Sequence, residues 1–185
     1  LVTKAQLKGF HYKPRLDKAL LARYSSGLIA LSGCSQGEIP HQLLAGKWEK
    51  AQDLAREYRD IFGPQNFFLE LQDHGLSVER EVNSGLVELS KALGLGLVAT
   101  NDVHYVDPSD GLAHQVLLSV QTQRDLDEAL ALPSKEYYLK TCEEMEKSFG
   151  QVPEAIENTV AIAHRCNVQL DLRGYHLPKT WVPPA

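Results

Sequence analysis

The sequence is poor in the residues that build disulfide frameworks, membrane spans and nucleotide-binding loops. It has three cysteines, Cys34, Cys142 and Cys166, and this odd, widely spaced set excludes a disulfide framework and favours a reducing cytoplasm. No apolar run approaches the roughly 18 residues of a membrane-spanning helix. There is also no Gly-rich phosphate loop and no Cys-x-x-Cys pair, so nucleotide binding by a Walker loop has no support.

The charge balance is acidic, which bears on possible nucleic-acid partners. Nineteen Lys and Arg residues face 24 Asp and Glu residues, for a net charge of -5. Nothing in that balance resembles the positive groove of a protein that grips nucleic acid mainly through its phosphates, so we expect any polyanion to be met locally, through metal. The apolar fraction of 43% is ordinary for one globular domain. The chain begins with Leu1 instead of Met, so we expect a piece of a longer polypeptide.

Three short apolar runs predict strands buried on both faces of a parallel sheet, at residues 27–31, 67–71 and 95–99. Helical patterns separate them, and strands that alternate with helices are typical of a (β/α) barrel or a related parallel α/β sheet. We expect Asp17 and Ser77 to cap helices, and Thr141 with Glu144 to form a capping box. The predicted helices cover residues 17–24, 38–44, 47–62, 78–93, 110–120, 141–149 and 153–166.

Each predicted strand is followed by residues able to bind a metal ion. Cys34 follows the first strand, His74 the second, and Asp102 with His104 the third. The Asp-x-His pair alone is weak, because a turn Asp beside a surface His is common. Since the carboxyl ends of parallel strands share one rim, all three together predict a metal site there. Alternatives stay open: Cys34 as a buried small hydrophobe, and His74 as a solvated loop residue.

Donor chemistry narrows the choice of metal and adds one weak catalytic candidate. Mixed Cys, His and Asp ligands favour zinc or another transition metal over magnesium. Glu70 alternates with Leu69 and Leu71, so its side chain is expected to point into a barrel. It is a candidate ligand or base, although a structural, hydrogen-bonding carboxylate is the reading we favour. We expect His114, beside apolar helical residues, to be packed instead of binding metal.

Several blocks of the sequence resemble the PHP (polymerase and histidinol phosphatase) domain of the bacterial DNA polymerase III alpha subunit family. They follow the order of that family over nearly the whole chain. The blocks are Gly27-Leu-Ile-Ala-Leu-Ser-Gly-Cys34 with Gly37-Glu-Ile-Pro40, Phe68-Leu-Glu-Leu-Gln72 with His74-Gly75, Val98-Ala-Thr-Asn-Asp-Val-His-Tyr105, and Pro153-Glu-Ala-Ile-Glu-Asn-Thr159 with Arg165-Cys-Asn-Val168.

The resemblance implies a fold and a site. The fold would be part of a distorted (β/α)7 TIM-like barrel whose N-terminal strands, with a His-x-His motif, precede Leu1. Residues 1–176 would be the C-terminal portion of the PHP domain, and residues 177–185 a proline-rich exit toward the polymerase palm. The rim would carry up to three metal ions, zinc or manganese, and the ligands in this chain would be Cys34, His74, Asp102 and His104.

The resemblance also implies a function. The parent would be a DNA-directed DNA polymerase of chromosome replication, with magnesium at a polymerase site outside this chain. Its PHP domain would be a metal-dependent phosphoesterase linked to 3′–5′ exonuclease proofreading, in which a water activated by metal attacks a phosphodiester. Expected partners are DNA, the sliding clamp, the clamp loader and a proofreading exonuclease. A non-catalytic structural or docking module, a free-standing phosphoesterase and an error-prone paralogue remain alternatives.

Overall fold

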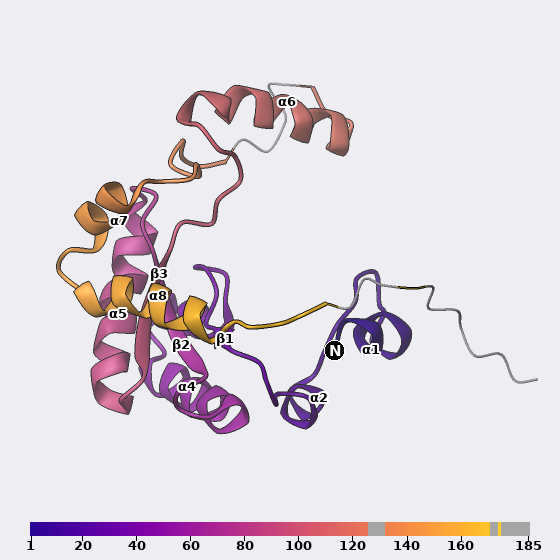
Figure 1. The fold of residues 1–185 in the computed structure, drawn as a ribbon, viewed down its shortest axis with the longest axis vertical. Coiled ribbons are helices and arrows are strands. Elements are labelled where there is room, and N and C mark those ends of the chain that lie inside the picture. The colour runs from indigo at the N-terminus through magenta and orange to yellow at the C-terminus, as the bar shows by residue number, and fades with distance from the viewer. Residues whose placement is uncertain (126–131, 171–173, 175–185) are drawn as a thin grey trace, which may run out of the picture.

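The computed structural model describes residues 1–125, 132–170 and residue 174. Several helices pack against a parallel sheet, whereas the first helix and the α-helix that follows the third strand lie away from it (Figure 1). The predicted exit, residues 177–185, lies outside the described residues. In chain order the elements are α1 (Val2–Lys8), α2 (Lys18–Arg23), β1 (Ala30–Leu31), α3 (Glu38–Leu44), α4 (Trp48–Phe62), β2 (Phe67–Gln72), α5 (Ser77–Leu93), β3 (Gly96–Thr100), the 3-10 helix η1 (Pro108–Asp110), α6 (Gly111–Thr122), α7 (Cys142–Phe149) and α8 (Pro153–Arg165).

The three strands are parallel and run in the order β1-β2-β3, as the alternation of strand and helix predicts. The first strand is shorter than expected, covering Ala30 and Leu31 instead of 27–31. In the described part of the chain, β1 pairs with a neighbouring strand on one side only, and Leu28 and Leu31 are partly exposed. Because few contacts stabilise the extended backbone here, the strand is short. A parallel α/β sheet is therefore established, whereas the remaining strands of a barrel stay a prediction.

The core lies between the sheet and the helices α4, α5 and α8. Leu69 and Leu71 of β2 are buried together with Leu86 and Leu89 of α5. Each such side chain contributes about 1.5–3 kcal/mol by leaving water. Close packing is made possible by small residues, because Ala51, Ala55 and Ala155 are completely buried where their helices meet the body.

Two of the three predicted helix caps are confirmed and one is not. Asp17 caps α2 by accepting a hydrogen bond from the Leu20 amide (2.7 Å), and Thr141 with Glu144 forms the predicted capping box. Ser77, in contrast, lies inside α5. The carboxylate of Glu79 takes the capping role by accepting from the amides of Leu76 and His74. Glu79, a residue of the first turn of α5, thus caps the helix in place of Ser77.

After β3 the chain leaves the body and forms an arm, residues 102–123, that carries η1 and α6 (Figure 1). The periodic apolar residues of α6 are present as predicted, but they remain exposed: Leu112 is 65% exposed, Leu117 67% and Val120 73%. The described helices include none that is both long and apolar enough to cross a membrane.

Candidate metal site at the carboxyl edge of the sheet

Three loops meet at the carboxyl edge of the sheet because the strands are parallel, and Tyr137 lies among them. Its ring stacks on His74 with centroids 4.0 Å apart and meets His104 edge-on at 5.5 Å. Burial raises the pKa of Tyr137, and the negative charges of Glu79, Asp102 and Cys34 raise it further. All three strand-end loops are therefore close enough to act on this phenol. Sequence reasoning missed Tyr137, since no local pattern ties residue 137 to loops more than 30 residues away.

Asp102 and His104 form the pair that the Asp-x-His motif predicts. The Asp102 Oδ2 and His104 Nε2 atoms are 3.6 Å apart, and both side chains are partly exposed. Asp102 has a φ of +43°, in the left-handed region that Asp tolerates better than most residues. The His104 amide donates to the Tyr137 carbonyl oxygen (2.8 Å), which fixes the loop. The pair is held in place while both side chains can still be reached from solvent.

His74 is placed differently, because both of its ring nitrogens are already engaged. Nδ1 lies 2.5 Å from Glu79 Oε1, and Nε2 lies 2.7 Å from the Asn101 carbonyl oxygen. A carbonyl oxygen only accepts, so Nε2 must carry a hydrogen. With 2% of the residue exposed, His74 offers no nitrogen to a metal ion unless one of these contacts breaks. The alternative of a solvated loop residue is wrong, since His74 is buried.

Glu70 holds the strand ends together. Its Oε2 accepts from the Gly33 amide (3.2 Å), and its Oε1 accepts from the Thr100 hydroxyl (2.5 Å) and the Gln72 side-chain amide (3.2 Å). One carboxylate thus links all three strands. The geometry supports the structural reading of Glu70 over that of a free base, because its donors already satisfy both oxygens.

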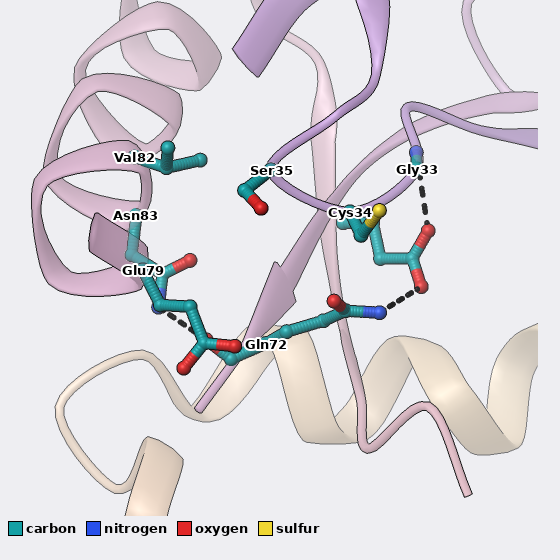
Figure 2. Close-up of a pocket in the computed structure, with 8 residues that line it drawn as sticks. Gly33, Cys34, Ser35, Gln72, Glu79, Val82 and Asn83 are labelled. Carbon is teal, nitrogen blue, oxygen red and sulfur yellow. Dashed lines mark hydrogen bonds between the residues drawn. The ribbon is translucent and has the colours of Figure 1, made fainter. Parts of the chain in front are cut away.

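Cys34 lies on the loop that Glu70 positions. Its side chain lines a small pocket together with Ser35 of the same loop and Glu79 and Asn83 of α5, and Cys34 lies on the side of the pocket away from α5 (Figure 2). Cys34 is exposed, so the alternative of a buried small hydrophobe is wrong. An exposed thiol at a strand end is available to a metal or to a labelling reagent.

The same loop, Gly33 to Gly37, fits the Gly-x-Ser-x-Gly pattern of a serine nucleophile elbow. Such an elbow strains the Ser backbone and places a His within hydrogen-bond reach. The positive φ belongs to Gly33 and not to Ser35, and no hydrogen bond joins Ser35 to a histidine among the described residues. The described residues therefore lack both features of such an elbow at Ser35.

The donor types suit a transition metal, since oxygen, nitrogen and sulfur ligands stand at one edge. Within residues 1–125 and 132–170, however, no three His, Cys, Asp or Glu side chains are grouped closely enough to hold a metal ion. The described residues contribute one pair, Asp102 with His104, and place Cys34 separately. Further ligands would have to come from elsewhere to complete a site.

Part of this edge of the sheet lies in a region that is similar to a known protein family. Residues 1–74 match the family model of the PHP domain. These 74 residues are therefore similar to a PHP domain. This PHP match ends at His74, so the loop with Asp102 and His104 lies beyond it.

Curated relatives extend the likeness over almost the whole chain. The chain is 44% identical to DNA polymerase III subunit alpha of Treponema pallidum, and the alignment covers 99% of the chain. It is 42% identical to the subunit of Thermus aquaticus, again over 99% of the chain. The subunit of Saccharopolyspora erythraea is 43% identical over 95% of the chain. The chain spans 16%, 16% and 15% of those relatives.

Proposed function

We propose that this chain is part of a DNA polymerase III alpha subunit, a DNA-directed DNA polymerase, and that it contributes to a metal-dependent PHP phosphoesterase site linked to 3′–5′ proofreading. The similarity to such subunits over 95–99% of the chain supports this assignment of the parent protein. The polymerase active site would lie outside the chain. Residues 1–176 would complete the PHP domain, and 177–185 would lead toward the palm.

The Asp102 and His104 pair carries the phosphoesterase proposal. Their donor atoms are 3.6 Å apart, partly exposed and fixed by the backbone contact with residue 137. Zinc or manganese would be held by this carboxylate and imidazole, with Cys34 as a third donor, and would supply charge stabilisation to a phosphoryl group. The upstream His-x-His motif would provide the remaining ligands.

The chain's own residues would orient that site. Glu70 fixes the Cys34 loop against Thr100 at the end of β3, two residues before Asp102. Tyr137 separates buried His74 from partly exposed His104 by contacting both rings. We therefore assign His74, first predicted as a ligand, a positioning role through Asn101, the residue that precedes Asp102.

The parent protein sets the remaining expectations. We propose DNA, the sliding clamp, the clamp loader and a separate proofreading exonuclease as partners, magnesium at the distant polymerase site, and a cytoplasmic location. These follow from the kind of protein that the relatives are named for.

A second candidate function is a non-catalytic PHP module that supports the polymerase or docks a separate exonuclease. Two observations favour it: His74 is fully engaged, and α6 exposes Leu112, Leu117 and Val120 on an arm outside the sheet body. An exposed apolar surface of this kind is typical of protein contacts.

Metal analysis and nuclease assays of the full-length subunit with His104→Ala decide between the two. The catalytic proposal expects less bound metal and loss of nuclease, with polymerase activity and folding unchanged. His164→Ala is the matched control, because His164 is an exposed histidine of α8 away from the strand ends. Unchanged nuclease and metal content in His104→Ala would leave only the docking function.

A further inference from the structure

The charge of the chain is divided very unevenly along its length. Residues 1–23 contain six Lys and Arg residues and a single acidic residue, Asp17, for a net charge of +5. The remaining residues contain 13 basic and 23 acidic residues, for a net charge of -10. The overall value of -5 is therefore the sum of two regions of opposite charge. The N-terminal region has the sign that attracts polyanions.

Four of the six basic residues of this region line an open cleft between α1 and α2. The cleft has a volume of about 550 Å³, and Lys4, Lys8, Arg15 and Arg23 contribute to its walls. Its one acidic residue, Asp17, is engaged as the cap of α2. Among the described residues, Lys4, Lys8 and Arg15 form no ion pair. Several cations thus share one concave surface without a counter-ion from the rest of the described chain.

Exposed aromatic rings stand beside the cleft, in the loop between α1 and α2. Phe10 is 57% exposed and Tyr12 86% exposed, in the run Phe10-His11-Tyr12-Lys13-Pro14-Arg15. Tyr12 has a φ of +59°, a left-handed conformation that is uncommon for an aromatic residue. The His11 ring meets the Tyr12 ring edge-on at 4.7 Å, so the two rings do not stack face to face.

We propose that this region binds single-stranded nucleic acid, with phosphates in the cleft near Lys4, Lys8 and Arg15 and a base stacked on Tyr12. A positive groove that follows the backbone, next to aromatic rings that accept unpaired bases, is the arrangement that single strands require. A duplex would satisfy only the phosphate part, since its bases are already stacked. The surface shares no residue with the strand-end site, so the inference goes beyond the proposed phosphoesterase function.

Fluorescence anisotropy of a dye-labelled oligothymidylate with the purified protein tests this surface. A chelator keeps the measurement independent of metal. The variant Lys4→Gln/Lys8→Gln/Arg15→Gln should bind on the order of 10-fold more weakly or worse at low salt, and its salt slope should fall by about 2. Tyr12→Ala should lose roughly 5-fold to 150-fold in affinity, whereas Tyr12→Phe should keep most of it, because stacking needs only the ring.

A matched control removes the same charge elsewhere. Lys50→Gln/Lys91→Gln/Lys147→Gln changes exposed lysines of α4, α5 and α7, and it should bind like the unmodified protein. Equal weakening in this control would overturn the proposal. Duplex DNA that binds as tightly as the single strand would also overturn it. So would polyglutamate that competes as well as the single strand, since the surface would then recognise only negative charge. Circular dichroism confirms that each variant is folded.

Failure of this proposal can be told apart from failure of the phosphoesterase proposal. His104→Ala should bind the oligothymidylate like the unmodified protein, because His104 lies at the sheet edge and not in the cleft. An inactive nuclease site would leave the anisotropy result unchanged. Weaker binding in His104→Ala would show that the strand-end site holds the single strand, and would overturn the separate surface.

Discussion

The sheet body buries its apolar side chains, whereas the arm that follows it leaves them exposed. In the body, α5 buries Val82, Leu86 and Leu89 against the sheet, whereas α6 in the arm has no buried residue. Both helices carry apolar residues at helical spacing. The pattern therefore predicts a helix in each case, but burial needs a partner surface that only the body provides within the described residues.

The two regions also divide the histidines of the strand ends. His74 is buried in the body and bonded at both nitrogens, while His104 at the base of the arm is accessible and paired with Asp102. This contrast leads us to expect that substitutions in the body change stability and that substitutions in the arm change binding.

The largest effect is expected for His74→Ala. This change leaves the Glu79 carboxylate buried without its partner and should lower the free energy of unfolding by about 3–5 kcal/mol. Urea denaturation measures the loss. Gln121→Ala, at an exposed position of α6 in the arm, is the control, expected within about 0.5 kcal/mol of the unmodified protein. Similar losses in both variants would remove the distinction between body and arm.

A pair of leucine substitutions sharpens the comparison. Leu86→Ala opens a cavity in a completely buried position and should cost about 2–5 kcal/mol, whereas Leu117→Ala should stay within about 0.5 kcal/mol. The same denaturation experiment gives both values. A large cost at Leu117 would mean that the arm is covered in solution, for example by a second copy of the chain.

A smaller effect is expected where the chain returns from the arm to the body. Thr141→Ala removes the side-chain oxygen that accepts from the Glu144 amide at the start of α7, and should cost about 1 kcal/mol. Thermal unfolding followed by circular dichroism is a suitable measurement. Thr141→Ser keeps the hydroxyl and should restore most of the loss; a variant as weak as Thr141→Ala would argue against the cap.

The smallest effect concerns two titrating groups at the same junction. The hydrogen bond to Glu144 raises the pKa of Tyr138 to about 12, and the hydrogen bond from the Thr141 amide lowers the pKa of Glu144. The Tyr138 contribution to stability should be lost as pH rises from the ordinary tyrosine value toward 12. The Glu144 contribution should be lost as pH falls through its lowered pKa.

Ultraviolet titration of tyrosinate in Glu144→Gln tests the Tyr138 shift. One tyrosine should then titrate closer to its ordinary pKa of about 10, because the charged acceptor is gone. Glu143→Gln, next to it on α7, is the matched control and should leave the titration curve unchanged. No change in Glu144→Gln would contradict the assignment.

Local patterns predicted most elements of the fold, because strands and helices reflect short-range periodicity. The three parallel strands and the bounds of α3 follow directly from residues 27–44, 67–71 and 95–99. The patterns failed where pairing and burial decide, because β1 is shorter than the predicted run at residues 27–31. They also misplaced the cap of α5, where Glu79 takes the role expected of Ser77.

The candidate site could be predicted only in part for the same reason. Asp102 and His104 are two residues apart, so one loop brings them together. The role of His74 depends on Glu79, Asn101 and Tyr137, and the last two lie 27 and 63 positions farther along the chain. Overall charge likewise concealed the basic cleft, since composition ignores position.

Strand β1 has a consequence for handling the chain by itself. It pairs with β2 on one side, and in the described part of the chain its outer backbone groups meet no other strand. Open strand margins of this kind act as templates for intermolecular pairing. The isolated chain should therefore self-associate as its concentration rises. A charged substitution at Leu28, which is partly exposed beside β1, should reduce this self-association.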